Sequence, residues 1–120
     1  MTGRGRYTDD LGGQASEAAF VRSAHAHARV RDIDVSGALD VEGVEAIYSW
    51  EDLDPGVSVP MPLLRSHPGI ERLRTAHALA RDEVCYAGQP IVAVIARDRY
   101  VAEDAAARIA VDYEELEPIV

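Results

Sequence analysis

Few side chains in this sequence could do chemistry by themselves. The only cysteine is Cys85, and two of the histidines, His25 and His27, stand two residues apart. A cysteine can act as a nucleophile, and a histidine pair can contribute to a metal site. Either role needs neighbouring groups, so the surrounding residues decide between a reactive site and a structural one.

The histidine pair lies in "HAHARVRDID", residues 25–34, whose alternation predicts a half-buried strand. Both imidazoles would then share one face, as a metal site requires. A zinc site also needs a third and usually a fourth ligand, whereas Arg29 and Arg31 continue this face and would repel a cation. A hydrogen-bonded surface pair is therefore the preferred interpretation, and a small metal protein is the alternative.

Cys85 has two acidic neighbours, Asp82 and Glu83, and no base close in sequence. A reactive cysteine needs a base or a positive field that favours the thiolate, so we predict a structural thiol, in the core or on the surface. The stretch that follows, "YAGQP" (86–90), has one glycine and lacks the spacing of a phosphate-binding loop. It predicts a turn into a strand that begins with Pro90.

Pairs of adjacent acidic residues are the remaining candidates for acid–base chemistry. Neighbours in sequence do not face each other on a helix or a strand, so these pairs predict solvated faces. His67 has no obvious partner, and no GxSxG motif is present. We therefore predict no catalytic, cofactor-binding or metal-binding residue in this chain. The pairs are Asp9-Asp10, Asp82-Glu83, Glu103-Asp104 and Glu114-Glu115.

The composition is that of an ordinary folded chain, with 120 residues of which 48% are hydrophobic and 28% charged. A net charge of −9 argues against a nucleic-acid partner and against an anionic membrane surface. No apolar run approaches the roughly 20 residues of a transmembrane helix, and the N-terminus has no secretory signal pattern. A single cysteine makes a reducing compartment the default, so we expect a cytoplasmic protein.

Several short elements must position these side chains. Residues 1–17 are rich in glycine and polar residues and predict an extended arm. Ser36 is the expected N-cap and Gly43 the expected stop of a first helical turn, and a second turn starts at Ser49 or at Asp52. The expected strands are 18–23, 25–34 and 44–49, with the first helical turn at 35–43.

Residues 54–78 hold four of the six prolines, which exclude regular structure over most of this stretch. A loop of this length inside a domain is usually functional or packs against another surface. We therefore expect a long proline-rich loop at 54–78.

The last third of the chain has the clearest pattern. The continuous apolar run at 90–96 predicts a strand buried on both faces, and 78–86 predicts another strand with a turn at 81–83. Residues 109–116 alternate and predict the final strand. A strand–helix–strand unit after shorter elements indicates an α+β fold with a mixed sheet, in one domain spanning 1–120. The helix has Asp98 as its expected N-cap and an apolar stripe of Val101, Ala102, Ala105, Ala106 and Ile109.

Four phrases, in their order, resemble one known domain: "GRGRYTDDL" (3–11), "VRSAHAHARVRDIDVSGALDVEGVEAIYSWEDL" (21–53), "HPGI" (67–70) and "ALARDEVCYAGQPIVAVIARDRYVAEDAAARIAVDYEELEPIV" (78–120). The chain is similar to the N-terminal α/β-hammerhead domain of the molybdenum hydroxylase large subunit. That family includes xanthine dehydrogenase, aldehyde oxidase and aerobic carbon monoxide dehydrogenase. The proline-rich loop is most similar to the carbon monoxide dehydrogenase-like and bacterial aldehyde dehydrogenase-like branch. The chain departs from the family at "GGQASEA" (12–18), where an apolar proline-glycine phrase is usual.

The resemblance implies an α/β-hammerhead fold within a large oxidoreductase. Members of the family hydroxylate a carbon centre or oxidise CO. They carry molybdopterin in the large subunit and iron–sulfur clusters and FAD on other subunits or domains. The family's cofactor-binding and catalytic residues lie C-terminal to this domain, so the resemblance assigns none of them, and no cofactor, to this chain.

Two functions follow as expectations. The first is a scaffold domain or split subunit that packs on a molybdopterin-binding region or subunit and is inactive alone. The second is a stand-alone binding or structural module that keeps the fold, for example as a homodimer.

Overall fold

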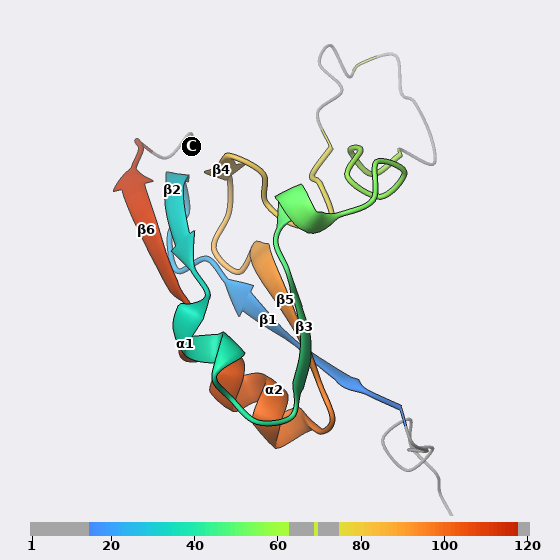
Figure 1. Ribbon diagram of the computed structural model, residues 1–120. Helices are drawn as coiled ribbons and strands as arrows, with labels where there is room; N and C mark the ends of the chain where they lie inside the picture. Colours follow the sequence, from blue (N-terminus) through green and yellow to red (C-terminus); the bar gives the residue numbers. More distant parts are fainter. Residues whose placement is uncertain (1–14, 63–68, 70–74, 118–120) are drawn as a thin grey trace, which may run out of the picture.

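The computed structural model describes residues 15–62, 69 and 75–117 (Figure 1). Figure 1 shows two groups of strands side by side, with both α-helices together at one end of them. In chain order the elements are β1 (Glu17–Arg22), β2 (Ala28–Asp34), α1 (Ser36–Leu39), β3 (Val44–Tyr48), the 3-10 helix η2 (Trp50–Asp52), β4 (Glu83–Val84), β5 (Pro90–Ala96), α2 (Arg99–Ala106) and β6 (Ala110–Glu115).

The strands form two three-stranded sheets. The first sheet has the order β1-β5-β3 and the second has the order β4-β2-β6. The expected α+β class is confirmed, with one correction to its sheet. Every pairing among the described strands is antiparallel, so the sheet is not mixed. The predicted strand–helix–strand unit exists as β5-α2-β6, but it connects the two sheets because β5 and β6 belong to different ones.

Strand β5 is the centre of the first sheet, as its continuous apolar run predicted. It pairs with β1 along one edge and with β3 along the other. Ile91 and Val92 point to opposite faces and are both fully buried, as is Val94. Burying a side chain of this kind contributes about 1.5–3 kcal/mol to stability, so β5 is the strand on which the fold most depends.

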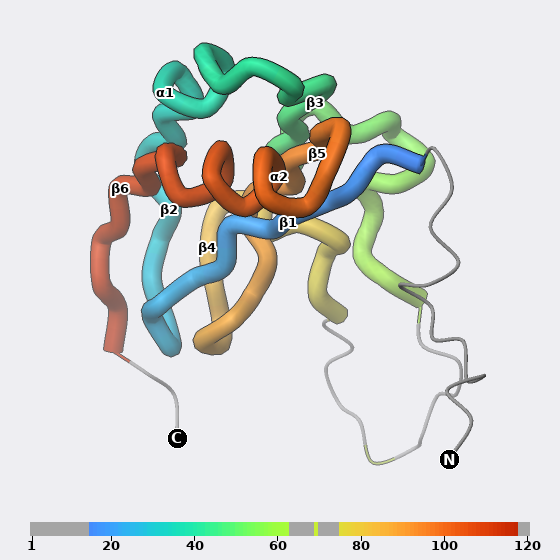
Figure 2. Tube along the Cα trace, turned by 90° about the horizontal axis from the view of Figure 1, so that it is seen from below, coloured from blue at the N-terminus to red at the C-terminus, as the bar shows by residue number. Residues whose placement is uncertain are grey.

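Helix α2 covers part of this sheet. Figure 2 shows it crossing β1, and it contacts both β1 and β5. Ala102 and Ala105 are fully buried there, because their small side chains allow close approach to the strands. The predicted N-cap is confirmed: Asp98 Oδ1 accepts the Val101 N–H at 2.9 Å. Ile109, the last residue of the predicted stripe, lies beyond the helix end at Ala106 but is still buried.

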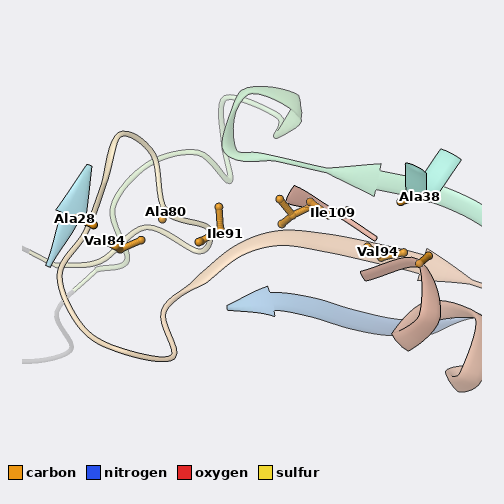
Figure 3. Close-up of a cluster of buried hydrophobic side chains, with 9 residues drawn as sticks. Ala28, Ala38, Ala80, Val84, Ile91, Val94 and Ile109 are labelled. Carbon is orange, nitrogen blue, oxygen red and sulfur yellow. The ribbon is translucent and has the colours of Figure 1, made fainter. Parts of the chain in front are cut away.

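The hydrophobic core is shared by both sheets, since β5 extends through it. Figure 3 shows Ile91 near side chains of the second sheet and Val94 near the helices. The core cluster consists of Ala28, Ala38, Ala80, Val84, Ile91, Val92, Val94, Ala105 and Ile109.

Strand β2 is shorter than predicted. It begins at Ala28 and not at residue 25, because the His25 N–H donates to Ser23 Oγ at 3.0 Å and turns the chain. Its pairing with β6 shifts between Val30 and Asp32, which makes Arg31 the extra residue of a β-bulge. The bulge reverses the alternation, so Val30 and Ile33 both pack against the core.

Other boundaries also differ from the predictions. Ser36 is not the N-cap of α1: Val35 holds that position, and Asp34 Oδ1 accepts the Ser36 N–H. Of the two predicted starts for the next turn, Ser49 is correct, since its N–H and its hydroxyl both donate to Asp52. The predicted strand at 78–86 is reduced to the two residues of β4.

Two expected irregular segments are only partly covered. Most of the arm expected at 1–17 lies outside the described residues, and Glu17 already belongs to β1. The described parts of 54–78 contain no helix or strand. His67 and the pair Asp9-Asp10 lie outside the described residues.

Candidate functional site

The two histidines of the sequence motif lie just before β2 and have separate partners. His27 Nδ1 is 2.6 Å from the backbone carbonyl oxygen of Glu117, and its Nε2 is 2.6 Å from Glu83 Oε1. His25 Nδ1 is 3.3 Å from Glu115 Oε1, and its ring centroid is 4.6 Å from that of Tyr113. The predicted hydrogen bonding is confirmed for the His27 ring, whereas the His25 ring makes an ion-pair contact.

The electrostatics of this end of the second sheet follow from those contacts. The hydrogen bond to the Glu117 carbonyl, and then the one to Glu83, raise the pKa of His27. Burial raises the pKa of Tyr113, against the effect of its hydrogen bond with Ser23. In the described part of the chain, no three His, Cys, Asp or Glu side chains converge as a metal site needs.

Most of the described acidic side chains in these pairs form surface ion pairs. Glu114 contacts both Arg29 and Arg31, the two arginines that were predicted to share a face with the histidines. The partners of the others are Arg81 for Asp82, His27 for Glu83, Arg99 for Glu103 and His25 for Glu115. The two members of Asp82-Glu83, and the two members of Glu114-Glu115, therefore have different partners.

Cys85 is exposed and opens the turn that was predicted at 86–90. Its N–H donates to Gln89 Oε1 at 2.7 Å, and Gln89 is buried. Gly88 has φ +89° and donates its N–H to the Ser23 carbonyl, while the Ser23 N–H donates to the Gln89 carbonyl. The turn therefore fixes the end of β1 against the start of β5, which is a structural role.

One cluster was missed in the sequence. Trp50 Nε1 donates to the Ser58 carbonyl at 3.0 Å, and His77 Nδ1 lies 2.8 Å from the same oxygen. The His77 ring stands edge-on to Trp50 at 5.9 Å, and the Arg81 guanidinium lies 4.4 Å from the Trp50 ring. The available signal was the only tryptophan of the chain, Trp50, which lies four residues before the start of the proline-rich loop at residue 54.

This cluster anchors the first part of the loop at Ser58, while the residues on either side of Ser58 are exposed. We call Val57, Val59 and Met61 the loop ridge: these alternating side chains are 54%, 55% and 51% exposed. The intervening Ser58 accepts from Trp50, and the Met61 N–H donates to the Ala76 carbonyl at 3.0 Å. The loop ridge therefore consists of three exposed apolar side chains on a turn whose backbone is held by hydrogen bonds at Ser58 and Met61.

A groove of about 510 Å³ lies between the two sheets, near the same cluster. Half-buried Val30, Ile33 and Ile47 line it together with Trp50. Leu39, at its margin, is 64% exposed. Charged side chains, among them Arg31 and Asp82, also line the groove. The Ser49 hydroxyl in it donates to Asp52 at 2.7 Å, which is the capping contact of η2.

The described residues do not fit the cofactors that the family resemblance implies. An iron–sulfur cluster is held by several cysteines, and this chain has one. Every buried side-chain nitrogen or oxygen in the described residues already has a hydrogen-bond partner. No helix among these residues has the length and apolarity needed to cross a membrane.

Comparison with known proteins gives a consistent result. The family model described as "Aldehyde oxidase and xanthine dehydrogenase, a/b hammerhead domain" matches residues 2–117. The carbon monoxide dehydrogenase large chain of Afipia carboxidovorans is 40% identical over 120 residues, which cover 98% of this chain and 14% of that protein. The nicotine 6-hydroxylase large subunit of Paenarthrobacter nicotinovorans is 36% identical over 122 residues, which cover 100% of this chain and 15% of that protein.

Solved structures show the same fold. Reconstituted CO dehydrogenase from Oligotropha carboxidovorans aligns with a TM-score of 0.80 and 39% identity, over 95% of this chain and 13% of that one. Quinoline 2-oxidoreductase from Pseudomonas putida 86 aligns with a TM-score of 0.82 and 34% identity, over 97% of this chain and 15% of that one. The chain thus spans about one seventh of these relatives, and it belongs to the a/b hammerhead domain family of aldehyde oxidase and xanthine dehydrogenase.

Proposed function

We propose that this chain is a scaffold part of the large subunit of a molybdenum-dependent oxidoreductase, as a single domain or as a split subunit. It packs on the molybdopterin-binding region or subunit and has no catalytic residue of its own. Two relatives are named as a large chain and a large subunit, and this chain covers 14% and 15% of them. The chemistry of the enzyme then belongs to the remaining parts, in the reducing cytoplasm that a single exposed Cys85 suits.

The observation that carries this proposal is the loop ridge. Its three side chains are all more than half exposed, although the backbone between them is fixed by hydrogen bonds from Trp50 and to Ala76. Exposed apolar side chains close together in the chain are common where a surface packs on another protein surface.

The cofactors of the family are assigned to the partner regions. Molybdopterin would lie in the region on which this chain packs, and iron–sulfur clusters and FAD in other subunits or domains. The support is the ligand chemistry of this chain: it has one cysteine, and its two motif histidines are already bound to Glu83, Glu115 and Glu117.

A chimera tests the proposal. This chain replaces the matching segment of the Afipia carboxidovorans carbon monoxide dehydrogenase large chain, and the assembled, active enzyme is quantified. We expect assembly and activity. Replacing the loop ridge by serine (Val57→Ser, Val59→Ser, Met61→Ser) should reduce the amount of assembled enzyme several-fold, while kcat per assembled molecule stays the same.

The matched control is Tyr100→Ser, because Tyr100 is 80% exposed on α2, away from the loop ridge. This variant should assemble like the unmodified chimera, and so should Cys85→Ala. A folded chimera that never assembles would favour the stand-alone binding module instead. A Cys85→Ala enzyme that assembles fully but loses kcat would show that this chain takes part in catalysis.

A further inference from the structure

The ring of His27 lies between two oxygens that can only accept hydrogen bonds. Its Nδ1 faces the backbone carbonyl of Glu117 and its Nε2 faces the carboxylate of Glu83, each at 2.6 Å. A neutral imidazole has one N–H and one lone pair, whereas an imidazolium has two N–H donors. Only the imidazolium can donate to both oxygens at these distances.

We propose that protonated His27 is a pH-sensitive clamp, which joins β4 to the segment after β6 and opens when the ring loses its proton. Deprotonation leaves one ring nitrogen with a lone pair directed at an oxygen 2.6 Å away, and that contact is repulsive. The ring must then move away from Glu83 or from Glu117. This inference concerns the fold itself and does not depend on the proposed function.

The elements held by His27 have few other ties to β2. Strand β4 has two residues, paired as Ala28 with Val84 and Arg29 with Glu83. Beyond β6, the Leu116 N–H donates to the His27 carbonyl at 3.0 Å. Opening of the clamp should therefore loosen these two places before it affects the buried strand β5.

The charged groups around the ring favour its proton. On β4, Glu83 contacts His27 directly, while Asp82 is paired with Arg81. On β6 and on β2 with the turn before it, Glu115 is paired with His25, and Glu114 with Arg29 and Arg31. The carboxylate of Glu117 adds a negative charge on the residue whose carbonyl the ring contacts.

The sign of the pH effect follows from these contacts. The hydrogen bond to the Glu117 carbonyl and the one to Glu83 raise the pKa of His27 above the usual 6.5, and burial only partly opposes them. The stability that the clamp contributes is fully present below pH 6.5. It is lost as the pH rises through the raised pKa of the folded state.

A titration of the 120-residue chain by NMR tests the protonation state. We expect both ring nitrogens of His27 to carry protons at pH 6, and its pKa to lie above 6.5. Glu83→Gln should move that pKa toward 6.5, because it removes the anionic acceptor. The matched control is His25→Gln, which removes the neighbouring histidine and should leave His27 titrating above 6.5. A His27 that is neutral at pH 6, or that titrates at or below 6.5, would overturn the proposal.

Amide hydrogen exchange tests the mechanical consequence. The Leu116 amide bonds to His27 and the Val30 amide bonds to Asp82, next to β4. After correction for base catalysis, both should exchange about two- to tenfold faster above the pKa of His27, the factor expected for one lost hydrogen bond. The Arg97 amide, bonded to Gly43 at the other end of the molecule, should not change. Equal pH dependence at all three amides would show global loosening and would contradict the clamp.

Discussion

Among single residues, Gly88 offers the most direct test of the turn at the start of β5. Its φ of +89° is in the left-handed region, and a Cβ built there meets no atom within 4 Å. Gly88→Ala should therefore lose about 1–2 kcal/mol of unfolding free energy from backbone strain alone, measured by urea denaturation. Gly88→Asn should lose less, because asparagine tolerates this conformation better.

The matched control for that substitution is Gly56→Ala. Gly56 also lies in a turn, but its φ is not positive, and its added Cβ would meet only Asp54 Oδ1 at 3.2 Å. We expect a clearly smaller loss than for Gly88→Ala. Equal losses at both positions would mean that the left-handed backbone at Gly88 is not what makes alanine unfavourable.

Residues whose partners are close in sequence could be predicted, and residues with distant partners could not. Asp98 was identified as a cap because the Val101 N–H is three positions away. The acceptors of the His27 ring are 56 and 90 residues away in sequence, so no local sequence pattern could predict them. Trp50 and His77 were missed for the same reason, since their shared acceptor is brought between them only by the folded loop.

At the scale of elements, the cap of α2 is expected to determine how well this helix holds to the first sheet. Asp98→Ala removes the acceptor of the Val101 N–H, and the melting temperature should fall by roughly 2–6 °C. Asp98→Asn keeps an acceptor and should remain close to the unmodified chain. If both variants have the same melting temperature, well below that of the unmodified chain, the charge of Asp98 stabilises the helix and the hydrogen bond does not.

The same cap has a defined pH dependence. The hydrogen bond from the Val101 N–H is the main reason that the pKa of Asp98 lies below its usual 3.8. The part of its contribution that depends on the carboxylate charge is present above pH 3.8 and is lost as the pH falls through the lowered pKa. The protonated carboxyl group still has an oxygen that can accept. We therefore expect thermal melts between pH 7 and pH 2 to show a pH-dependent difference in melting temperature between the unmodified chain and Asp98→Ala. That difference should become smaller at the acid end of the range.

Elements with an uninterrupted pattern were predicted well, whereas those shaped by tertiary contacts were not. Strand β5 and helix α2 follow from an apolar run and an apolar stripe. The start of β2 does not follow from such a pattern. The Ser23 hydroxyl accepts the His25 N–H, and the strand begins only at Ala28. The bulge at Arg31 was likewise hidden, since alternation looks regular in the sequence and only pairing with β6 shows the extra residue.

At the scale of the whole molecule, the order of the strands could not be predicted from local sequence patterns. The sequence indicated an α+β chain with a strand–helix–strand end, but it gave no sign that β5 and β6 join different sheets. That separation is decided by β1 and β3, which pair with β5, and by β2, which pairs with β6. Both sheets then share one core around β5.

The loop ridge should also govern how the isolated chain behaves in solution. A net charge of −9 keeps copies apart by mutual repulsion, while the exposed side chains of Val57, Val59 and Met61 favour their association. Salt screens the repulsion and leaves the apolar attraction in place. We therefore expect light scattering to show weak, concentration-dependent association that increases from about 0.05 to 0.5 M salt, a range over which screening becomes short-ranged.

The triple serine variant of the loop ridge should abolish most of that association, and Tyr100→Ser should leave it unchanged. Both variants change only exposed side chains, so their unfolding free energies should stay within about 0.5 kcal/mol of the unmodified chain. A strictly monomeric chain at every salt concentration would mean that the loop ridge is too small to drive contacts alone. A compact dimer that is insensitive to the triple substitution would place the interface elsewhere and would favour the stand-alone module over the scaffold.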